Sequence, residues 1–285
     1  MIKIVADTSS DISWEYADKN NIKLIPLNLR FYDKKFNENR DYDFDRHYQY
    51  YSEDPKFSPK TAQPAPADFL EAYKELVEEG ATDIIVITIS SQLSGTLNSA
   101  NLAKMKLSET NPNITIHLVD SKNASYAEGF LVEKAVALKK KGKEAKKIAD
   151  ILRSTVSKIK SYLLVPTLKY LYYGGRISWT KYMIAKLLRK KAIIKAAEDG
   201  SLQPVEAISN VIEGAKKIIT LLQEEQEKSP KKIAIVYATN YDLRDTVIEL
   251  VNEQFPTSEL LTLRTRAAIT AHVSPSTIAV IAQFE

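Results

Sequence analysis

The chain has 285 residues, of which 44% are apolar, so it can form one large or two ordinary domains with a substantial core. Lys and Arg number 40 against 36 Asp and Glu, and this mixed charge, net +4, lacks the concentrated positive field of a nucleic-acid-binding protein. The absence of cysteine excludes disulfides, thiolate nucleophiles and Cys-based metal sites.

The first ten residues, MIKIVADTSS, form a strand pattern that ends in turn formers rather than the basic-then-apolar pattern of a signal peptide. No apolar run reaches the roughly 18 residues of a membrane-spanning helix. We therefore expect a soluble cytoplasmic protein.

Short apolar runs alternate with helical periods in the first half of the chain. Strands are expected at 2–6, 22–31, 84–89 and 114–119. One helix begins at Pro66 and ends before Gly80, a second spans 126–141 and ends before Gly142, and an amphipathic face follows from Ile148 to Ile159. This alternation predicts an N-terminal three-layer α/β/α domain, residues 1–159, with a mostly parallel sheet and a boundary near Ser157 to Lys160.

In the second half of the chain, strands and helices alternate less regularly. Strands are expected at Tyr162–Val165, Ile233–Tyr237 and Ile278–Phe284, and helices at Val211–Glu227 and Leu243–Phe255. A hairpin is predicted from Ala192–Ala197 and Leu202–Ser209 around the turn Glu198-Asp199-Gly200-Ser201. This order predicts a smaller C-terminal α/β domain, residues 160–285, with a mixed sheet.

A serine-rich segment follows the third predicted strand in the sequence ITISSQLSGTLNSA, residues 87–100. We call Ser90–Gly95 the serine loop. In an open parallel sheet, ligands bind where such a loop leads from the carboxyl end of a strand into a helix. The Ser94 hydroxyl can donate to a carboxylate or phosphate, and Gly95 permits close approach of a backbone. The alternative is that Ser94 and Thr96 only cap the following helix.

Two other segments carry candidate binding residues. Pro64 and Pro66 stiffen the segment that holds Thr61 and Gln63 before a helix N-terminus, although a rigid surface linker explains these residues equally well. Arg176 follows the pair Gly174-Gly175 and could clamp an anion or dock a partner, although a solvated surface arginine is the simpler interpretation.

These motifs together resemble a known family. They are Thr61-Ala62-Gln63-Pro64 followed by Asp68-Phe69, the segment Ser90–Thr96 with Ser99-Ala100, Asp120-Ser121, and Leu171–Ser178 with its Gly-Gly-Arg-Ile-Ser sequence. In this order, and over nearly the whole length, the chain resembles the bacterial DegV family. Members of that family bind fatty acids and serve as the carrier component of fatty acid kinase.

The resemblance implies a long-chain fatty acid bound between the two domains, and no other cofactor or metal. The family's carboxylate-holding residues match Thr61 and Ser94, with Gln63 and Gly95 in the same loops, and its pocket histidine matches His272. A partner ATP-dependent kinase would phosphorylate the carboxylate to an acyl phosphate, so the carrier itself would not be an enzyme. Arg176 matches the position that we associate with phosphotransfer or the partner.

The sequence departs from the family pattern in three places. Ala62 and Ala65 stand where serine is usual, and the glycine-rich turn after the histidine is here His272-Val273-Ser274-Pro275-Ser276. Ser209–Glu213 replaces a basic cluster. The head-group end of the pocket and the contacts with a partner are therefore expected to differ from those of the family.

A serine hydrolase is the first alternative function. Ser94 would be the nucleophile and His272 the base, with Asp7 or Asp120 as the orienting acid. The sequence Leu93-Ser94-Gly95 lacks the first glycine of the G-x-S-x-G nucleophile motif, which disfavours this interpretation.

A basic surface that binds membrane or nucleic acid is the second alternative. Residues 179–195, WTKYMIAKLLRKKAIIK, combine apolar and basic side chains as in helices that rest on anionic lipid. A packed helix with a solvated basic face explains them equally well. We expect transient membrane contact and no nucleic acid.

Overall fold

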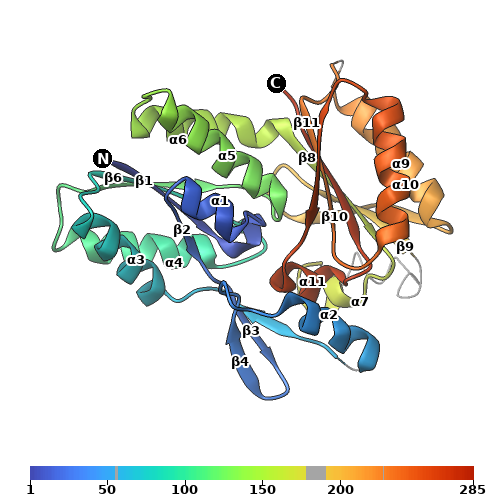
Figure 1. The fold of residues 1–285 in the computed structure, drawn as a ribbon, viewed down its shortest axis with the longest axis horizontal. Helices are drawn as coiled ribbons and strands as arrows, with labels where there is room; N and C mark the ends of the chain where they lie inside the picture. The colour runs from blue at the N-terminus through green and yellow to red at the C-terminus, as the bar shows by residue number, and fades with distance from the viewer. Residues whose placement is uncertain (55–56, 178–190, 227) are drawn as a thin grey trace. The chain divides into compact units, whose positions relative to one another are not determined.

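A computed structural model describes residues 1–54, 57–177, 191–226 and 228–285. The chain forms two compact units: the first comprises residues 1–42 and 61–156, the second residues 43–60 and 157–285 (Figure 1). The division near residue 156 lies close to the predicted boundary at 159, but residues 43–60 belong to the second unit, contrary to the predicted ranges. The second unit is therefore not the smaller one.

The first unit is built on a parallel sheet of four strands in the order β2-β1-β6-β7. The two central strands are almost wholly buried, as expected of strands that are covered on both faces. The bounds of the four strands are β1 (Ile2–Asp7), β2 (Ile22–Ile25), β6 (Asp83–Thr88) and β7 (Thr115–Asp120).

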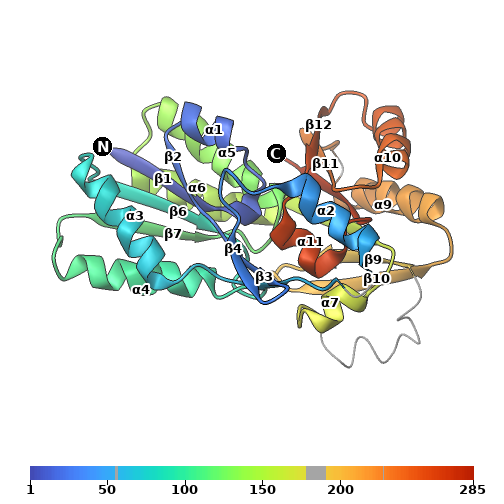
Figure 2. The same ribbon diagram turned by 60° about the horizontal axis from the view of Figure 1, so that its bottom comes forward.

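Helices cover both faces of this sheet, with α3 (Pro66–Glu78) and α4 (Thr96–Ser108) on one face (Figures 1 and 2). On the other face lie α5 (Tyr126–Lys140) and α6 (Ala145–Thr155), while α1 (Trp14–Lys19) contacts β2. Pro66 begins α3 as predicted, and Gly80 and Gly142 follow α3 and α5 with positive φ angles of 87° and 70°. Phe69, Tyr73 and Ala100 pack with Val5 and Ile84 in the core of the α3–α4 face.

The predicted strand 22–31 is wrong, because it is two strands in two sheets. Pro26 lies at the break, and β3 (Asn28–Phe31) joins a separate sheet with β4 (Lys34–Asn37) and β5 (Lys60–Ala62) in the order β4-β3-β5. Tyr32 and Asp33 form the β3–β4 turn with positive φ angles of 47° and 58°. Two consecutive positive φ angles are the conformation of a tight hairpin turn.

The second unit is built on a mixed sheet of six strands in the order β10-β9-β8-β13-β11-β12. Among the strands that the structure describes here, only β11 and β12 pair in parallel, and the other neighbours are antiparallel. The strands are β8 (Ile159–Val165), β9 (Lys191–Ala196), β10 (Leu202–Ile208), β11 (Lys232–Tyr237), β12 (Glu259–Arg264) and β13 (Ile278–Gln283). The predicted hairpin is β9–β10, whereas β12 was not predicted. A parallel sheet and a mixed sheet in one α/β protein agree with the predicted fold class.

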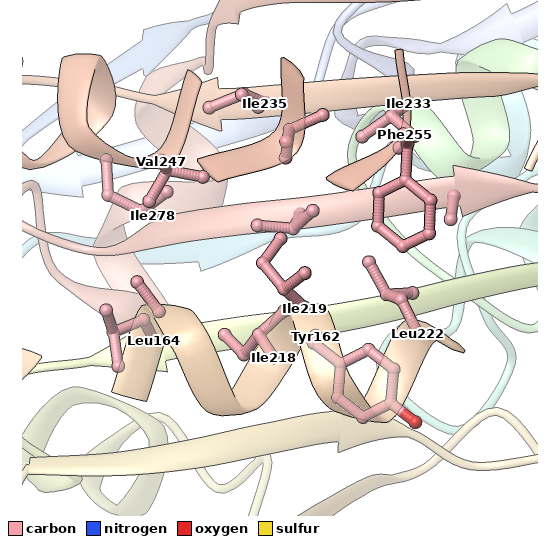
Figure 3. Packing of buried hydrophobic residues seen from close by; sticks show 14 of the residues in the cluster. Tyr162, Leu164, Ile218, Ile219, Leu222, Ile233, Ile235, Val247, Phe255 and Ile278 are labelled. Atoms are coloured by element: carbon pink, nitrogen blue, oxygen red, sulfur yellow. The ribbon is translucent and has the colours of Figure 1, made fainter. Parts of the chain in front are cut away.

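Two predicted helices, α9 (Val211–Glu225) and α10 (Tyr241–Gln254), cover one face of the mixed sheet. Figure 3 shows Ile218, Ile219 and Leu222 of α9 directed toward β8, the strand that carries Tyr162 and Leu164. In the described part of this unit, three helices were not predicted: α2 (Phe44–Glu53), α7 (Lys169–Tyr173) and α11 (Ala267–Val273). Short 3-10 turns follow β1 (η1, Thr8–Ser10) and precede β8 (η2, Val156–Lys158).

Candidate functional site

The serine loop leaves the carboxyl end of β6 and leads into α4, as the sequence predicts. The start of the loop is held by hydrogen bonds to residues of β1 and residues beyond β7. The Ile89 N–H donates to Asp7 Oδ2 of β1 at 3.0 Å, and the Ser90 N–H donates to the Asn123 carbonyl beyond β7 at 2.8 Å. The loop is therefore held at its start by hydrogen bonds that residues distant in sequence provide.

The hydroxyls of the loop have different tasks. Buried Ser90 accepts from the Gln92 N–H at 3.2 Å, and Ser91 donates to Asp120 Oδ2 at 2.6 Å. These two residues shape the loop itself. Ser94 Oγ lies 2.9 Å from Thr96 Oγ1 and accepts from the Thr96 N–H at 3.3 Å. Ser94 thus does contribute to the start of α4, as the capping alternative predicts, while Gly95 occupies the N-cap position.

Gln63 is the residue directly after β5, and its side chain reaches the serine loop. Its side-chain amide lies against Gly95, where an added Cβ would come within 2.3 Å of Gln63 Oε1. Gln63 Nε2 also donates to Ser99 Oγ of α4 at 3.2 Å. Gly95 is therefore required for this close approach. Thr61 lies two residues earlier and is half-buried.

A pocket of about 690 Å³ lies beside the loop in the first unit. Ser94 and Gly95 line it together with the apolar side chain of Leu118 and the cationic side chains of Lys122 and Arg153. Arg153 is held by Asp150 and by the Leu118 carbonyl, both at 2.9 Å. The pocket therefore offers hydroxyl, apolar and positively charged groups together.

His272 of α11 and Arg176 meet around Gly174 in the second unit. A Cβ added to Gly174 would lie 2.3 Å from His272 Nδ1, and the Arg176 guanidinium donates to the Gly174 carbonyl. Burial, and then the charge of Arg176, lowers the pKa of His272 from 6.5 to about 4, so its imidazole is neutral at pH 7. Burial also lowers the pKa of Arg176.

The predicted site residues thus fall into two groups. Thr61, Gln63, Ser94 and Gly95 belong to the first unit, and Arg176 and His272 belong to the second. Within each group the structure brings together residues that are far apart in sequence: Gln63 meets Gly95, and His272 meets Gly174 next to Arg176.

The two acids considered for a hydrolase are engaged in the structure of the loops. Asp7 accepts the Ile89 and Ser9 N–H groups, and Asp120 accepts from Ser91 and from the Lys122 N–H at 2.9 Å. These contacts give Asp7 and Asp120 a structural task in the first unit. The sequence analysis did not identify Glu128, whose carboxyl group is wholly buried beside Asp7. The available signal was the polar sequence Asp7–Asp11 at the end of a strand, which indicates a polar site at that edge but does not point to Glu128 itself.

Two further predictions concern metals and membranes. Among residues 1–54, 57–177, 191–226 and 228–285, no group of three or more His, Asp or Glu is placed to hold a metal ion, and no helix has the length and apolarity to cross a membrane. The predicted basic helix 179–195 lies mostly outside the described residues. Its last residues, 191–195, belong to strand β9 and are not helical.

Comparison with known proteins identifies the family. A family model described as "Uncharacterised protein, DegV family" matches residues 1–285. A DegV domain-containing protein of Staphylococcus aureus (strain N315) is 31% identical over 282 residues, which cover 98% of this chain and 97% of that protein.

Solved structures show the same fold. DegV from Bacillus subtilis, described as a fatty acid binding protein, is 26% identical with a TM-score of 0.89 and covers 100% of this chain and 99% of its own. The fatty acid kinase B3 protein from Streptococcus pneumoniae, loaded with linoleic acid, is 24% identical with a TM-score of 0.85, and the match covers 100% of both chains. Because the family model matches residues 1–285 and the Staphylococcus relative is 31% identical over nearly the whole chain, this chain belongs to the DegV family.

Proposed function

We propose that this protein binds a long-chain fatty acid and presents its carboxylate to an ATP-dependent kinase, which forms an acyl phosphate. The observation that carries this proposal is the cluster at the start of α4. There Ser94, Gly95 and the Gln63 amide converge at the carboxyl edge of a parallel sheet, where the free N–H groups of a helix favour an anion.

In this proposal Thr61 and Ser94 hold the carboxylate by hydrogen bonds, with Gln63 and Gly95 shaping the head-group loop. His272 is proposed as a further ligand-binding residue, a neutral donor or acceptor, which suits its lowered pKa. Arg176 serves phosphotransfer or contact with the kinase. In this proposal the carrier performs no chemistry itself: its groups bind and orient the carboxylate, and the kinase transfers the phosphoryl group.

A fatty acid fits this division of tasks. Each buried methylene contributes about 0.8 kcal/mol, so a tail of about fifteen carbons supplies on the order of 10 kcal/mol gross. A hydrogen bond to a charged group contributes about 1.5–3 kcal/mol. The tail therefore sets the affinity, and the hydroxyls fix the position of the carboxylate and permit its burial. The description of the Bacillus relative as a fatty acid binding protein supports this ligand class.

Extraction of the purified protein tests the ligand. Denaturation in organic solvent followed by mass spectrometry should release a long-chain fatty acid in near-stoichiometric amount. Lipid-free protein should rebind added fatty acid. A protein that releases no lipid and also fails to bind added long-chain fatty acids would overturn the proposal.

A second assay tests the role as a carrier. The loaded protein is mixed with ATP and the catalytic subunit of a bacterial fatty acid kinase, and acyl phosphate is trapped with hydroxylamine. We expect hydroxamate only when both proteins are present. Hydroxamate formed from the carrier and ATP alone would show that the carrier is itself the kinase. If the complete mixture formed no hydroxamate, the proposed carrier role would be wrong, while the proposed fatty acid binding would be unaffected.

A further inference from the structure

Two buried carboxyl groups share one hydroxyl behind the serine loop. Asp7 ends β1 and Glu128 lies in the first turn of α5, and both side chains are 0% exposed. The hydroxyl of Ser9 in η1 contacts Asp7 Oδ1 and also Glu128 Oε2, the latter at 2.9 Å. Ser9 and Glu128, which lie 119 positions apart in sequence, are thus in direct contact.

The number of protons decides the state of these groups. A serine hydroxyl has one proton and can donate to one carboxylate oxygen only. If Asp7 and Glu128 were both ionised, one of the two short contacts to Ser9 would set lone pairs against lone pairs. One carboxyl must therefore keep its proton and donate to Ser9 Oγ.

The surroundings assign that proton to Glu128. Asp7 accepts from the Ile89 N–H at 3.0 Å, the Ser9 N–H at 2.9 Å and the Ser9 hydroxyl, and three donors favour an ionised carboxylate. Glu128 Oε1 is buried and has no hydrogen-bond partner in the described part of the chain. A charged oxygen in that position would be far more costly than the carbonyl oxygen of a neutral acid.

The direction of the pKa shifts agrees with this assignment. Burial, and then the negative charge of Asp7, raises the pKa of Glu128 well above 4.5, while hydrogen bonds from Ser9 and the Asp7 backbone oppose the rise. Burial also raises the pKa of Asp7, and the hydrogen bonds from Ser9 and Ile89 limit that rise.

We infer that Glu128 keeps its proton at neutral pH and is a positioning residue for the serine loop. Its O–H donates to Ser9, Ser9 donates to Asp7, and Asp7 accepts the N–H of Ile89, the residue directly before the loop. The protonation of Glu128 stands on its own contacts, whereas its effect on a bound carboxylate rests on the proposed function.

The groups that face Glu128 are acidic. Asp7 lies on β1, and Asp11, after η1, accepts from the Ser125 hydroxyl at the N-cap of α5 at 2.5 Å. Glu38 accepts from the hydroxyl of Thr8, the residue before Ser9, at 2.8 Å. Because Glu128 holds its proton more tightly in the folded than in the unfolded chain, its contribution to stability is complete below its unfolded pKa and is lost as the pH rises toward its raised folded pKa.

The test uses the isosteric change Glu128→Gln, with Glu71→Gln as the matched control. The glutamine amide still donates to Ser9 but cannot ionise, and Glu71 is an exposed glutamate on α3 of the same unit. Unfolding free energy is measured in urea from mildly acidic to alkaline pH. We expect a weaker loss of stability with rising pH in Glu128→Gln than in the wild type and in Glu71→Gln. Equal slopes in all three proteins would overturn the inference.

Two further measurements separate positioning from a general effect on stability. In the wild type, the NMR shifts of the Ile89 and Ser90 amides should change as the pH rises, and in Glu128→Gln they should stay constant. Fatty acid affinity should fall with pH in the wild type and fall less in Glu128→Gln. Amide shifts that do not respond in the wild type would remove the positioning role.

Asp7→Asn locates the proton. We expect it to lower stability at all pH values, since an amide nitrogen cannot accept the Ile89 N–H. A neutral Asp7→Asn together with a strongly destabilised Glu128→Gln would place the proton on Asp7 and overturn the assignment. If Asp7→Asn does not fold, the Glu128→Gln profile still decides. If no protein binds fatty acid, the proposed function fails while the urea profiles and amide shifts still test Glu128.

Discussion

The interior of the second unit and the carboxyl edge of the first unit are buried in different ways. The second unit centres on an apolar cluster around Leu222, Ile233 and Phe255 (Figure 3). The edge of the first unit buries Asp7, Glu128 and several hydroxyls. Apolar burial stabilises without direction, whereas a buried polar group is tolerated only with its partners in place. The apolar cluster therefore sets stability, and the polar edge sets the geometry of one loop.

Removing apolar volume from the second unit should have the largest effect. Leu222 of α9 is 0% exposed, and Leu222→Ala should lower the free energy of unfolding by about 2–5 kcal/mol, since it leaves a cavity as well as losing the transfer free energy. Urea denaturation measures the change.

The matched control is Leu102→Ala on α4. Leu102 is 45% exposed, so its truncation should change the free energy of unfolding by no more than about 0.5 kcal/mol. Equal losses in the two variants would show that the apolar cluster does not set stability and would end this part of the comparison.

The two units should also respond to pH in opposite directions. Burial lowers the pKa of His47 and, with the charge of Arg176, that of His272 from 6.5 to about 4. A base with a lowered folded pKa contributes stability above its unfolded pKa and loses it as the pH falls, here between 6.5 and about 4. A tenfold difference in proton affinity between the folded and the unfolded chain corresponds to about 1.4 kcal/mol of stability.

His272→Gln tests this expectation, because glutamine cannot be protonated. The variant should lose less stability than the wild type over that acidic range, as measured by urea denaturation at each pH. His272 and Glu128 should thus produce slopes of opposite sign: stability is lost as the pH falls below 6.5 for His272, and it is lost as the pH rises above the unfolded pKa for Glu128. Parallel profiles of the wild type and His272→Gln would show that this imidazole does not titrate in the folded protein as its burial requires.

Local sequence signals predicted much of the fold. Helices α3 (Pro66–Glu78) and α5 (Tyr126–Lys140) combine apolar periodicity with Pro66 at the start of α3 and with Gly80 or Gly142 beyond the end, so these ends have a physical cause within a few residues. The assignment of residues 43–60 to the second unit had no such signal. It depends on contacts more than 200 positions apart, such as the Tyr48 hydroxyl with the Thr265 carbonyl.

The candidate site divides in the same way. Ser94 and Gly95 were predicted from a local pattern, a serine-rich turn between a strand and a helix. The tasks of Ser90 and Ser91 in shaping the loop, and the fit of Gln63 against Gly95, depend on residues that only the fold brings together. Glu128 was missed because the start of α5 is buried on all sides, so helical periodicity does not mark a buried face there.

Ser94→Ala should affect binding of the carboxylate more than stability. If Ser94 donates to the charged head group, its loss should cost about 1.5–3 kcal/mol, or about tenfold to about a hundredfold in the dissociation constant. Isothermal titration with a long-chain fatty acid measures this. With the corresponding methyl ester, which carries no charge, the difference between the wild type and Ser94→Ala should shrink.

Ser91→Ala is the control from the same loop. It removes the hydrogen bond to Asp120 but no group proposed to touch the ligand, so affinity should change less than in Ser94→Ala. If Ser91→Ala weakened binding as much as Ser94→Ala, the polar edge would act through overall loop order rather than through one hydroxyl.

Gly95→Ala should have the smallest effect and tests how finely the polar edge is fitted. The added methyl would meet the Gln63 amide, the mobile end of a flexible side chain, so the amide should move away and lose its bond to Ser99 while the fold persists. The loss of one neutral hydrogen bond corresponds to about 0.5–1.5 kcal/mol.

A double-mutant cycle with Gln63→Ala tests whether Gly95→Ala acts through the Gln63 side chain. If it does, the double variant should bind fatty acid no more weakly than Gln63→Ala alone. Additive losses would instead mean that the methyl disturbs the start of α4 directly, because the two changes would then act on separate groups.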